Sequence, residues 1–288
     1  MPSKSGSSAP KMPINTFTKL VELCVPVSPI EVTKLPKKVQ EMRSNLIKIC
    51  GQAEGLMESH YSAILESFDS PLHHLDLFPY HTNYIKLGQL EFNILSQHYP
   101  HTPTQIAFIG SGPLPLTSVV LASKHLTSTI FHNYDIDESA NSLATNLVSS
   151  DANLSKRMIF HTTDIMSVTD TLREYDIVFL AALVGGYDHL AKHMATGATL
   201  MLRSAHGART FLYPVIDPCD LRGFEVLSVY HPTDEVINSV VIARKTALAV
   251  HTVDQGRGAA MFMPCKFSDI PPFNHGNMIE ELTVEEIL

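Results

Sequence analysis

Apolar residues follow two different patterns along the chain, and the pattern changes near residue 104. Before that point they recur every three to four residues, which is typical of helices that bury one face. We expect helices over 14–24, 36–66 and 82–98. The second has apolar residues at helical spacing: Val39, Met42, Leu46, Ile49, Ala53 and Leu56. The pattern predicts an all-helical N-terminal region.

After residue 104 the apolar residues come in short continuous runs, among them QIAFIG, TIFHNYDID, RMIFHTTDI, YDIVFLAALV and ATLMLRSAHG. Segments compatible with helices lie between them, for instance 138–149 and 187–195. Alternating strands and helices predict an α/β fold with a parallel, doubly wound sheet. The last two runs, 224–232 and 236–245, are joined by a short link, so this pair could be antiparallel.

These patterns divide the chain into four expected segments. Residues 1–16 have no apolar core, so we expect a disordered leader and no secretory signal. A helical domain is expected over 17–103 and a Rossmann-like domain over 104–245. Residues 246–288 are dotted with glycine and proline and end in acids, which predicts a weakly structured tail.

Charge and cysteine usage narrow the class of protein. The 288 residues carry a net charge of −8 with 21 basic residues, which argues against nucleic acid or an anionic membrane as the partner. The apolar runs are too short to cross a bilayer. The four cysteines lie far apart without a CxxC pair, which predicts reduced thiols in a cytoplasmic protein.

A glycine turn follows the first expected strand, in the sequence AFIGSGPLPLTSVVLA. A strand that runs into glycine and restarts as a helix is typical of nucleotide-binding folds. Asp135 and Asp164 end the next two strands, where acids can bind ribose hydroxyls and an adenine amino group. Each acid could instead cap the following helix. Their order favours a nucleoside site formed by Gly110, Ser111, Gly112, Pro113, Thr117, Asp135 and Asp164.

The turn also indicates which nucleoside binds. Dinucleotide sites carry a third glycine that lets pyrophosphate approach the helix, but Pro115 stands at that position and no basic residue lies in the turn. A nucleoside without phosphate fits better. S-adenosylmethionine is the first candidate, and NAD is the alternative.

The helix expected over 82–98 has a polar face formed by Lys86, Gln89, Asn93, Ser96 and Gln97. Steps of about 100° per residue place Glu91 nearly opposite that face. A carboxylate on an apolar face is costly unless it is paired or used. Glu91 could form a buried salt bridge with an arginine of the sheet domain, or accept a proton with a pKa raised by burial. Tyr80 and Tyr84 could orient it, or simply belong to the core.

The sequence LRSAHGAR follows the fifth expected strand. The guanidinium groups of Arg203 and Arg209 match substrate carboxylates in two-point contacts, and His206 could accept or relay a proton. The alternative is a polar loop with solvated side chains. His189 and His193 would share a helix face, but no acid or cysteine completes a ligand set nearby, so we expect no metal site.

Long blocks of the chain resemble nicotianamine synthase of the plant type. Among them are FPYHTNYIKLGQLEFNILSQH, FIGSGPLPLTSVVLASKHL, FHNYDID, YDIVFLAALVG and MFMPC, and the resemblance extends from about residue 17 onward. It implies a methyltransferase-like Rossmann fold behind an N-terminal all-helical domain. It also implies an aminocarboxypropyl transferase that joins three S-adenosylmethionine molecules, releases three methylthioadenosines and closes an azetidine ring.

The resemblance further implies that S-adenosylmethionine is the substrate, with no other cofactor, and that the product chelates iron, zinc and copper. Because members of the family are thought to use a glutamate in the helix over 82–98, it favours Glu91 as the catalytic base. The chain departs from the family after Gly185, where a charged helical segment is missing. An ordinary methyltransferase and an inactive S-adenosylmethionine-binding variant are therefore the alternatives.

Overall fold

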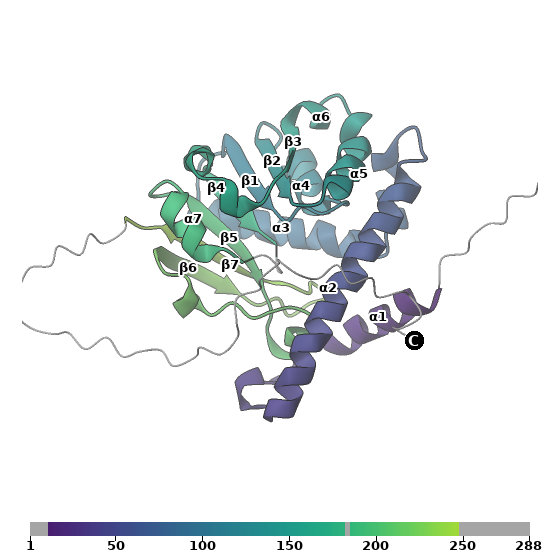
Figure 1. The fold of residues 1–288 in the computed structure, drawn as a ribbon, viewed down its shortest axis with the longest axis vertical. Helices are drawn as coiled ribbons and strands as arrows, with labels where there is room; N and C mark the ends of the chain where they lie inside the picture. Colours follow the sequence, from purple (N-terminus) through teal and green to yellow (C-terminus); the bar gives the residue numbers. More distant parts are fainter. Residues whose placement is uncertain (1–10, 182–184, 248–288) are drawn as a thin grey trace, which may run out of the picture. The chain divides into compact units, whose positions relative to one another are not determined.

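The computed structural model describes residues 11–181 and 185–247, which lie in one compact unit (Figure 1). The first ten residues of the expected leader and residues 248–288 of the expected tail lie outside this description. Helix α1 (Lys11–Cys24) begins inside the stretch expected to be a leader and ends two residues before Pro26. Proline lacks the N–H that would continue the helix.

The expected N-terminal helices are confirmed as α1, α2 (Lys37–Leu65) and α3 (His81–His98). Short 3-10 segments connect them, η1 (Val32–Lys34) and η2 (Pro71–Leu77). None of the helices in the described part of the chain has the length and apolar character needed to cross a membrane.

One seven-stranded sheet follows, in the order β3-β2-β1-β4-β5-β7-β6. Its strands are β1 (Gln105–Ile109), β2 (Ile130–Asp135), β3 (Met158–Thr162), β4 (Ile177–Leu180), β5 (Thr199–Ser204), β6 (Phe224–Tyr230) and β7 (Ser239–Lys245). The first five are parallel, whereas β7 is antiparallel to both β5 and β6. The α/β fold is confirmed, and so is the antiparallel final pair.

The crossover helices are short. They are α4 (Leu116–Val120) with its π-helical continuation η3 (Leu121–His125), α5 (Glu138–Ser149), α6 (Leu154–Arg157) and α7 (Tyr187–His193). The remaining connections contain the 3-10 turns η4 (Ile165–Ser167), η5 (Asp170–Glu174), η6 (Gly207–Phe211) and η7 (Pro218–Asp220). Residues 138–149 and 187–195 are thus helical largely as the sequence predicts.

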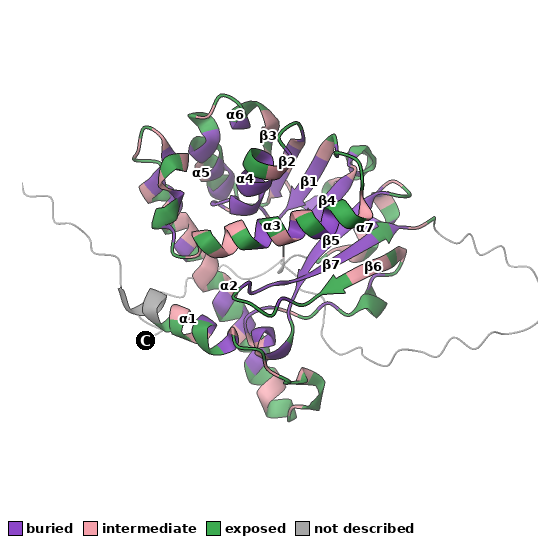
Figure 2. Cartoon of the chain, turned by 180° about the vertical axis from the view of Figure 1, so that it is seen from behind, coloured by how far each residue is buried: buried purple, intermediate pink, exposed green. Residues whose placement is uncertain are grey.

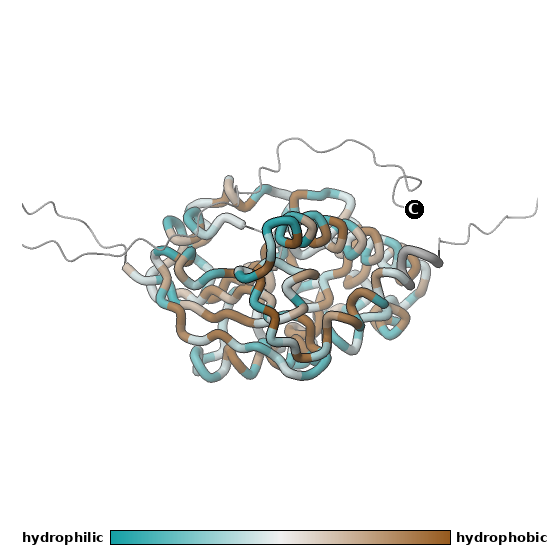
Figure 3. Tube along the Cα trace, turned by 90° about the horizontal axis from the view of Figure 1, so that it is seen from below, coloured by the Kyte–Doolittle hydropathy of each residue, from teal (hydrophilic) through white to brown (hydrophobic). Residues whose placement is uncertain are grey.

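The two faces of the sheet belong to different hydrophobic clusters, because side chains alternate along a strand. Ile106 and Phe108 of β1 pack in one cluster with residues of α2 and α3. Ala107 and Ile109 pack in the other with residues of α7. Figure 2 shows α3 lying across the sheet when it is seen from behind, and Figure 3 shows apolar residues gathered along the middle of the trace. The N-terminal helices therefore share a core with the sheet.

Helix α2 is confirmed, but several of its periodic apolar residues face solvent. Met42, Ile49 and Leu56 are 56%, 49% and 67% exposed. The buried side contains Arg43, whose Nε–H donates to the carbonyl oxygen of Thr210 at 2.6 Å. The face of α2 that meets the sheet domain is therefore partly polar, and apolar periodicity alone points to the other face.

Strand β1 lies between β2 and β4, where the direction of the strand order reverses. In open α/β sheets, ligands bind at this switch point, beside the carboxyl ends of the strands. Helix α2 is fixed there, because Ser62 Oγ–H donates to the carbonyl oxygen of Pro113 at 2.6 Å. The N-terminal helices thus meet the sheet at the edge where a nucleoside is expected.

Candidate functional site

The glycine turn, residues 110–112, is held in a conformation that requires glycine at two positions. Gly110 has φ 77° and Gly112 has φ 66°, in the left-handed region that disfavours other residues. Gly112 N–H donates to Asp135 Oδ2 at 2.8 Å, and Asp137 N–H donates to Asp135 Oδ1 at 3.0 Å. The structure brings the turn and Asp135 together, and each carboxylate oxygen keeps a lone pair for a hydroxyl group.

The other predicted nucleoside residues lie in varied surroundings. Asp164 is exposed and accepts Met166 N–H at 2.9 Å, so it caps η4 as the alternative reading of the sequence allows. Ser111 is buried, and its Oγ has no hydrogen-bond partner among the described residues. The hydroxyl of Thr117 accepts a hydrogen bond from the guanidinium of Arg203. Roles in nucleoside binding stay predictions for all of them.

Glu91 and Arg203 form a buried ion pair between α3 and β5. Arg203 Nε donates to Glu91 Oε1 at 2.8 Å and Nη2 donates to Oε2 at 3.2 Å. Glu91 is 1% exposed and Arg203 is 8% exposed. Burial alone would lower the pKa of Arg203, but the charge of Glu91 outweighs it and the pKa is raised. The structure thus shows the buried salt bridge that is one alternative for Glu91. Its partner is Arg203, which the sequence predicts to bind a substrate carboxylate.

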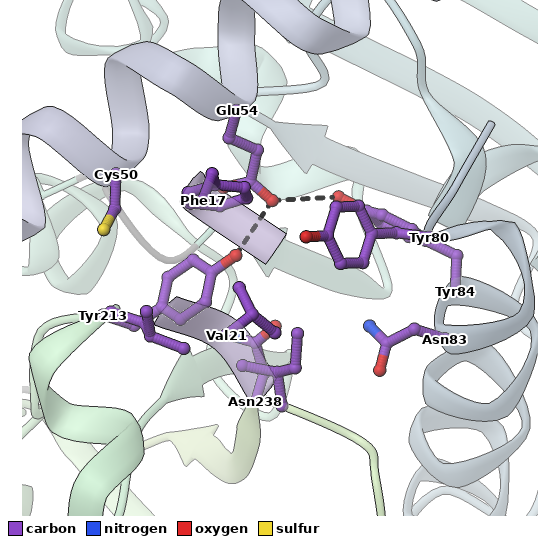
Figure 4. Close-up of a pocket in the computed structure, with 11 residues that line it drawn as sticks. Phe17, Val21, Cys50, Glu54, Tyr80, Asn83, Tyr84, Tyr213 and Asn238 are labelled. Carbon is purple, nitrogen blue, oxygen red and sulfur yellow. Dashed lines mark hydrogen bonds between the residues drawn. The ribbon is translucent and has the colours of Figure 1, made fainter. Parts of the chain in front are cut away.

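A second group of acids lies nearby on α2, and we call Glu54, Glu58, Tyr84 and Tyr213 the acid–tyrosine cluster. Tyr213 Oη lies 2.9 Å from Glu54 Oε1 and donates to it. Tyr84 Oη lies 3.2 Å from Glu58 Oε1 and 3.5 Å from Glu54 Oε1. Figure 4 shows both tyrosines directed at the Glu54 carboxylate. The described residues bring no arginine or lysine into an ion pair with either acid.

Burial raises the pKa of both acids. The pKa of Glu54 is raised by burial, although hydrogen bonds from Tyr213 and Tyr84 and the charge of Arg203 oppose the rise. The pKa of Glu58 is raised well above its usual value, first by burial and then by the charge of Glu54. The same burial and the neighbouring acids raise the pKa of both tyrosines, which stay protonated donors. A carboxyl group with a raised pKa is suited to accept a proton near neutrality.

Glu58 also connects the acid–tyrosine cluster to the glycine turn. A Cβ built on Gly112 would lie 3.0 Å from Glu58 Oε2, so the carboxylate lies directly against the turn. The charge of Asp135 is close enough to contribute to the raised pKa of Glu58. Glu58 therefore lies against the turn at which the sequence predicts a nucleoside.

A small pocket opens beside the acid–tyrosine cluster, with about 380 Å³ of space when the open solvent at its mouth is included. Its walls come from α1, α2, α3, the segment after β5 and the segment before β7. The lining residues are Phe17, Val21, Cys50, Glu54, Tyr80, Asn83, Tyr84, Leu212, Tyr213, Ile237 and Asn238. Of the predicted catalytic residues, Tyr80 and Tyr84 thus reach the pocket.

The remaining predicted residues lie elsewhere. Arg209 is 4% exposed and its guanidinium donates to the carbonyl oxygens of Val25, Pro232 and Asp234, which holds the N-terminal segment and the loop before β7 together. His206 is exposed and stacks on His231 with ring centres 4.2 Å apart. The described chain contains no cluster of three metal-ligating side chains.

Sequence reasoning missed Glu54, Glu58 and Tyr213. The acids are four residues apart on one helix, which places both carboxylates on the same face. Gly51 and Gly55 stand beside them in the helix interior, where glycine is unfavourable unless a function requires it. This combination is the signal that could have found the acids. Tyr213 lies in a segment without regular structure, and no pattern marks it.

Comparison with known proteins gives matches along most of the chain. A family model described as nicotianamine synthase protein matches residues 3–250. A nicotianamine synthase of Solanum lycopersicum is 58% identical over 297 residues, covering 99% of this chain and 94% of that protein. A probable nicotianamine synthase of Arabidopsis thaliana is 64% identical over 240 residues, covering 80% of this chain and 74% of that protein.

A solved structure of a glutamine variant of a protein designated MtNAS, in complex with S-adenosylmethionine, has the same fold. Its TM-score is 0.69 at 20% identity, and the match covers 81% of this chain and 91% of that chain. The fold, the glycine turn and the identity to plant proteins over nearly the whole length agree, and on that basis the chain belongs to the nicotianamine synthase family.

Proposed function

We propose that this chain condenses three S-adenosylmethionine molecules into nicotianamine by transfer of 3-amino-3-carboxypropyl groups, with release of three methylthioadenosines. The observation that carries the proposal is the contact of the acid–tyrosine cluster with the glycine turn, in a chain 58% identical to a nicotianamine synthase. S-adenosylmethionine is the substrate, and the proposal needs no other cofactor. The product would bind iron, zinc or copper.

The nucleoside of the donor molecule is proposed to bind at the glycine turn. Its ribose hydroxyls would donate to Asp135, whose carboxylate the backbone N–H groups of Gly112 and Asp137 already orient. The adenine is assigned to the side of Asp164, as the sequence predicts. This orientation directs the sulfonium and the aminocarboxypropyl group toward Glu58.

The chemical step needs a neutral amine. The ammonium group of the acceptor loses a proton to the Glu58 carboxylate. The amine lone pair then forms a bond to the aminocarboxypropyl carbon that is attached to the sulfonium sulfur of the donor. The carbon–sulfur bond breaks with its electron pair going to sulfur, which leaves as neutral methylthioadenosine. Tyr84, within 3.2 Å of Glu58, orients the carboxyl group. Because sulfur leaves without a charge, no general acid is required.

Glu91 remains the alternative base that the family resemblance favours. Both of its oxygens accept from Arg203, and a proton acceptor in that position would have to give up one of these bonds. We therefore assign the base role to Glu58 and a positioning role to the Glu91–Arg203 pair. The Arg203 guanidinium carbon lies 5.9 Å from the centre of the Tyr84 ring, so the pair supports the wall of the acid–tyrosine cluster.

An inactive binding variant is the second candidate, because of the segment missing after Gly185. Residues 182–184, which precede the gap, lie outside the described residues. The alignment with the tomato protein runs over 297 residues, more than the 288 of this chain, so that protein contains positions this chain lacks. The cytoplasm is the proposed compartment, in keeping with the unpaired thiols of Cys24 and Cys50.

The purified chain incubated with S-adenosylmethionine alone tests the proposal. We expect methylthioadenosine and nicotianamine in a ratio of about three to one, measured by chromatography with mass spectrometry. S-adenosylhomocysteine as the released nucleoside would contradict the proposal in favour of a methyltransferase. Binding without any release of nucleoside would support the inactive variant, and restoring turnover by grafting the family's charged segment after Gly185 would identify the gap as the cause.

A further inference from the structure

Two asparagine side chains from different elements line the pocket. Asn83 comes from the first turn of α3 and Asn238 from the residue before β7 (Figure 4). Asn238 is 5% exposed. Neither residue belongs to the acid–tyrosine cluster or to the glycine turn, and the proposed chemistry does not use them.

Each of these amides has a buried atom without a partner in the part of the chain that the structure describes. For Asn238 it is Nδ2, a hydrogen-bond donor, and for Asn83 it is Oδ1, an acceptor. A buried polar group without a partner destabilises the folded state, so such groups in a pocket indicate a ligand that supplies the partner. One unsatisfied donor and one unsatisfied acceptor call for a ligand with an acceptor and a donor of its own.

The charges around the pocket indicate which chemical group of a ligand would meet these two asparagines. Glu54 lines the same pocket, and Glu58 lies beside it, so positive charge is favoured there. The two arginines that could bind a carboxylate are engaged with the protein, Arg203 with Glu91 and Arg209 with backbone carbonyl groups. A carboxylate in the pocket must therefore rely on neutral donors, and Asn238 Nδ2 is a buried one.

We propose that Asn238 and Asn83 recognise the α-amino acid head group of the acceptor molecule. Asn238 Nδ2 donates to its carboxylate, and Asn83 Oδ1 accepts from its ammonium group. This inference rests on the proposed function, since it divides the site into a nucleoside subsite at the glycine turn and an acceptor subsite at the asparagines. The apolar side chains of Phe17, Val21 and Ile237 would cover the methylene groups between the two.

The subsite explains how the acceptor amine reaches the base. The ammonium group held by Asn83 lies on the α3 side of the pocket, one residue from Tyr84, which contacts Glu58. A head group fixed at both ends presents its amine in one orientation, and orientation of this kind lowers the barrier to a bimolecular step. Both asparagines are positioning residues and do not take part in proton transfer.

The same substitution at the two positions tests the assignment. Asn238→Asp removes the donor and adds a charge that repels a carboxylate, whereas Asn83→Asp keeps an acceptor oxygen and adds a charge that attracts an ammonium group. Asn93→Asp is the matched control, because Asn93 is exposed on the same helix as Asn83 and bonds only to Gln89 in the described structure. Calorimetry would measure two probes: nicotianamine, which has the head group and no nucleoside, and methylthioadenosine, which has the nucleoside and no head group.

We expect Asn238→Asp to weaken nicotianamine binding by about tenfold or more, since a hydrogen bond to a charged group is lost. Asn83→Asp should bind nicotianamine at least as tightly as the parent. Methylthioadenosine affinity should stay within about twofold for both. Equal losses in the two variants, no loss in either, or a loss in Asn83→Asp alone would overturn the assignment.

Two further measurements keep the outcomes distinct. If Asn238→Asp fails to fold, two other variants replace it: Asn238→Ser keeps a hydrogen-bond donor and Asn238→Ala does not. Weaker nicotianamine binding in the alanine variant alone supports the subsite. Equal binding by the two variants overturns it. Release of methylthioadenosine from S-adenosylmethionine by the parent tests the proposed function separately. If the parent shows no turnover but the variants still show the expected pattern of nicotianamine binding, the acceptor subsite is supported and the proposed reaction is contradicted.

Discussion

Two sets of acids lie close together in this molecule, a buried one at Glu91 and a half-buried one at Glu54 and Glu58, and they differ in their partners. Glu91 on α3 has the full guanidinium of Arg203 against it, at 2.8 and 3.2 Å. Within residues 11–181 and 185–247, Glu54 and Glu58 on α2 have only tyrosine hydroxyls as hydrogen-bond partners of their side chains, at 2.9 to 3.5 Å. The more deeply buried acid is Glu91, so depth of burial alone does not identify a proton acceptor. What distinguishes the two is whether a cation forms a direct ion pair with the carboxylate.

The difference has a direct chemical consequence. To accept a proton, Glu91 would have to give up one of its hydrogen bonds from Arg203. Among the described residues, Glu58 has no cation paired directly with it, and burial and the charge of Glu54 raise its pKa. It therefore binds a proton more tightly than an ordinary glutamate does. Substitutions at these acids and at the glycine turn separate the two roles.

Glu91→Gln should destabilise the fold by about 3–5 kcal/mol, because it leaves the Arg203 charge buried without compensation. Thermal unfolding by calorimetry measures the loss. The double variant Glu91→Leu, Arg203→Met removes both charges and should recover much of it. A Glu91→Gln protein that unfolds at the parent's temperature yet has lost turnover would instead make Glu91 the base.

Asp135→Ala should weaken S-adenosylmethionine binding by about tenfold or more, since a charge-assisted hydrogen bond is worth about 1.5–3 kcal/mol. Calorimetric titration with S-adenosylmethionine measures the change. Asp164→Ala is the comparison, because Asp164 is exposed and caps η4. Unchanged affinity in Asp135→Ala would remove the ribose role.

Gly112→Ala should lower nucleoside affinity and cost about 1–2 kcal/mol of stability, because alanine at φ 66° is strained and its Cβ would press on Glu58. Gly55→Ala is the control within α2, where a Cβ meets nothing within 4 Å and the helix should gain about 0.5–1 kcal/mol. Denaturant unfolding of the two variants gives both values. Equal effects would mean that Glu58 is not held against the turn.

The pH dependence of stability should show the smallest effect. Because the folded-state pKa of Glu58 is raised, its protonated form contributes stability below the unfolded value of about 4.3, and this contribution is lost as pH rises through the folded-state pKa. Between these two pKa values the unfolding temperature of the parent should decline as pH rises. Replacing Glu58 with glutamine should flatten that decline. A decline as steep in the variant as in the parent would show that Glu58 ionises normally.

Much of the architecture could be predicted from the sequence, and the acids show where prediction stopped. Periodicity in α3 correctly placed Glu91 on the buried face, since its polar residues occupy one side of the helix. In α2 the apolar residues Met42, Ile49 and Leu56 are exposed, so the same reasoning selected the wrong face and passed over Glu54 and Glu58. The pairing of Glu91 with Arg203 joins residues 112 positions apart, a contact that no local pattern specifies.

The glycine turn shows the opposite case. Gly110, Gly112 and Asp135 could be found from sequence because the turn must adopt positive φ angles and the acid must end the neighbouring strand. Asp164 satisfies the same rule, yet its carboxylate caps η4. Rules that depend on local conformation therefore predict the turn well, whereas the use of each side chain depends on its surroundings in three dimensions.

The turnover of Glu58→Gln tests the central claim most directly. Glutamine keeps the size of the side chain and its hydrogen bond with Tyr84 but cannot take the proton, so the rate of methylthioadenosine release should fall by about 10²–10⁴-fold. Measured on the same preparation, methylthioadenosine binding should stay close to that of the parent, and the unfolding temperature should not fall below it. A Glu58→Gln protein that binds and turns over like the parent would contradict the account and return the base role to Glu91.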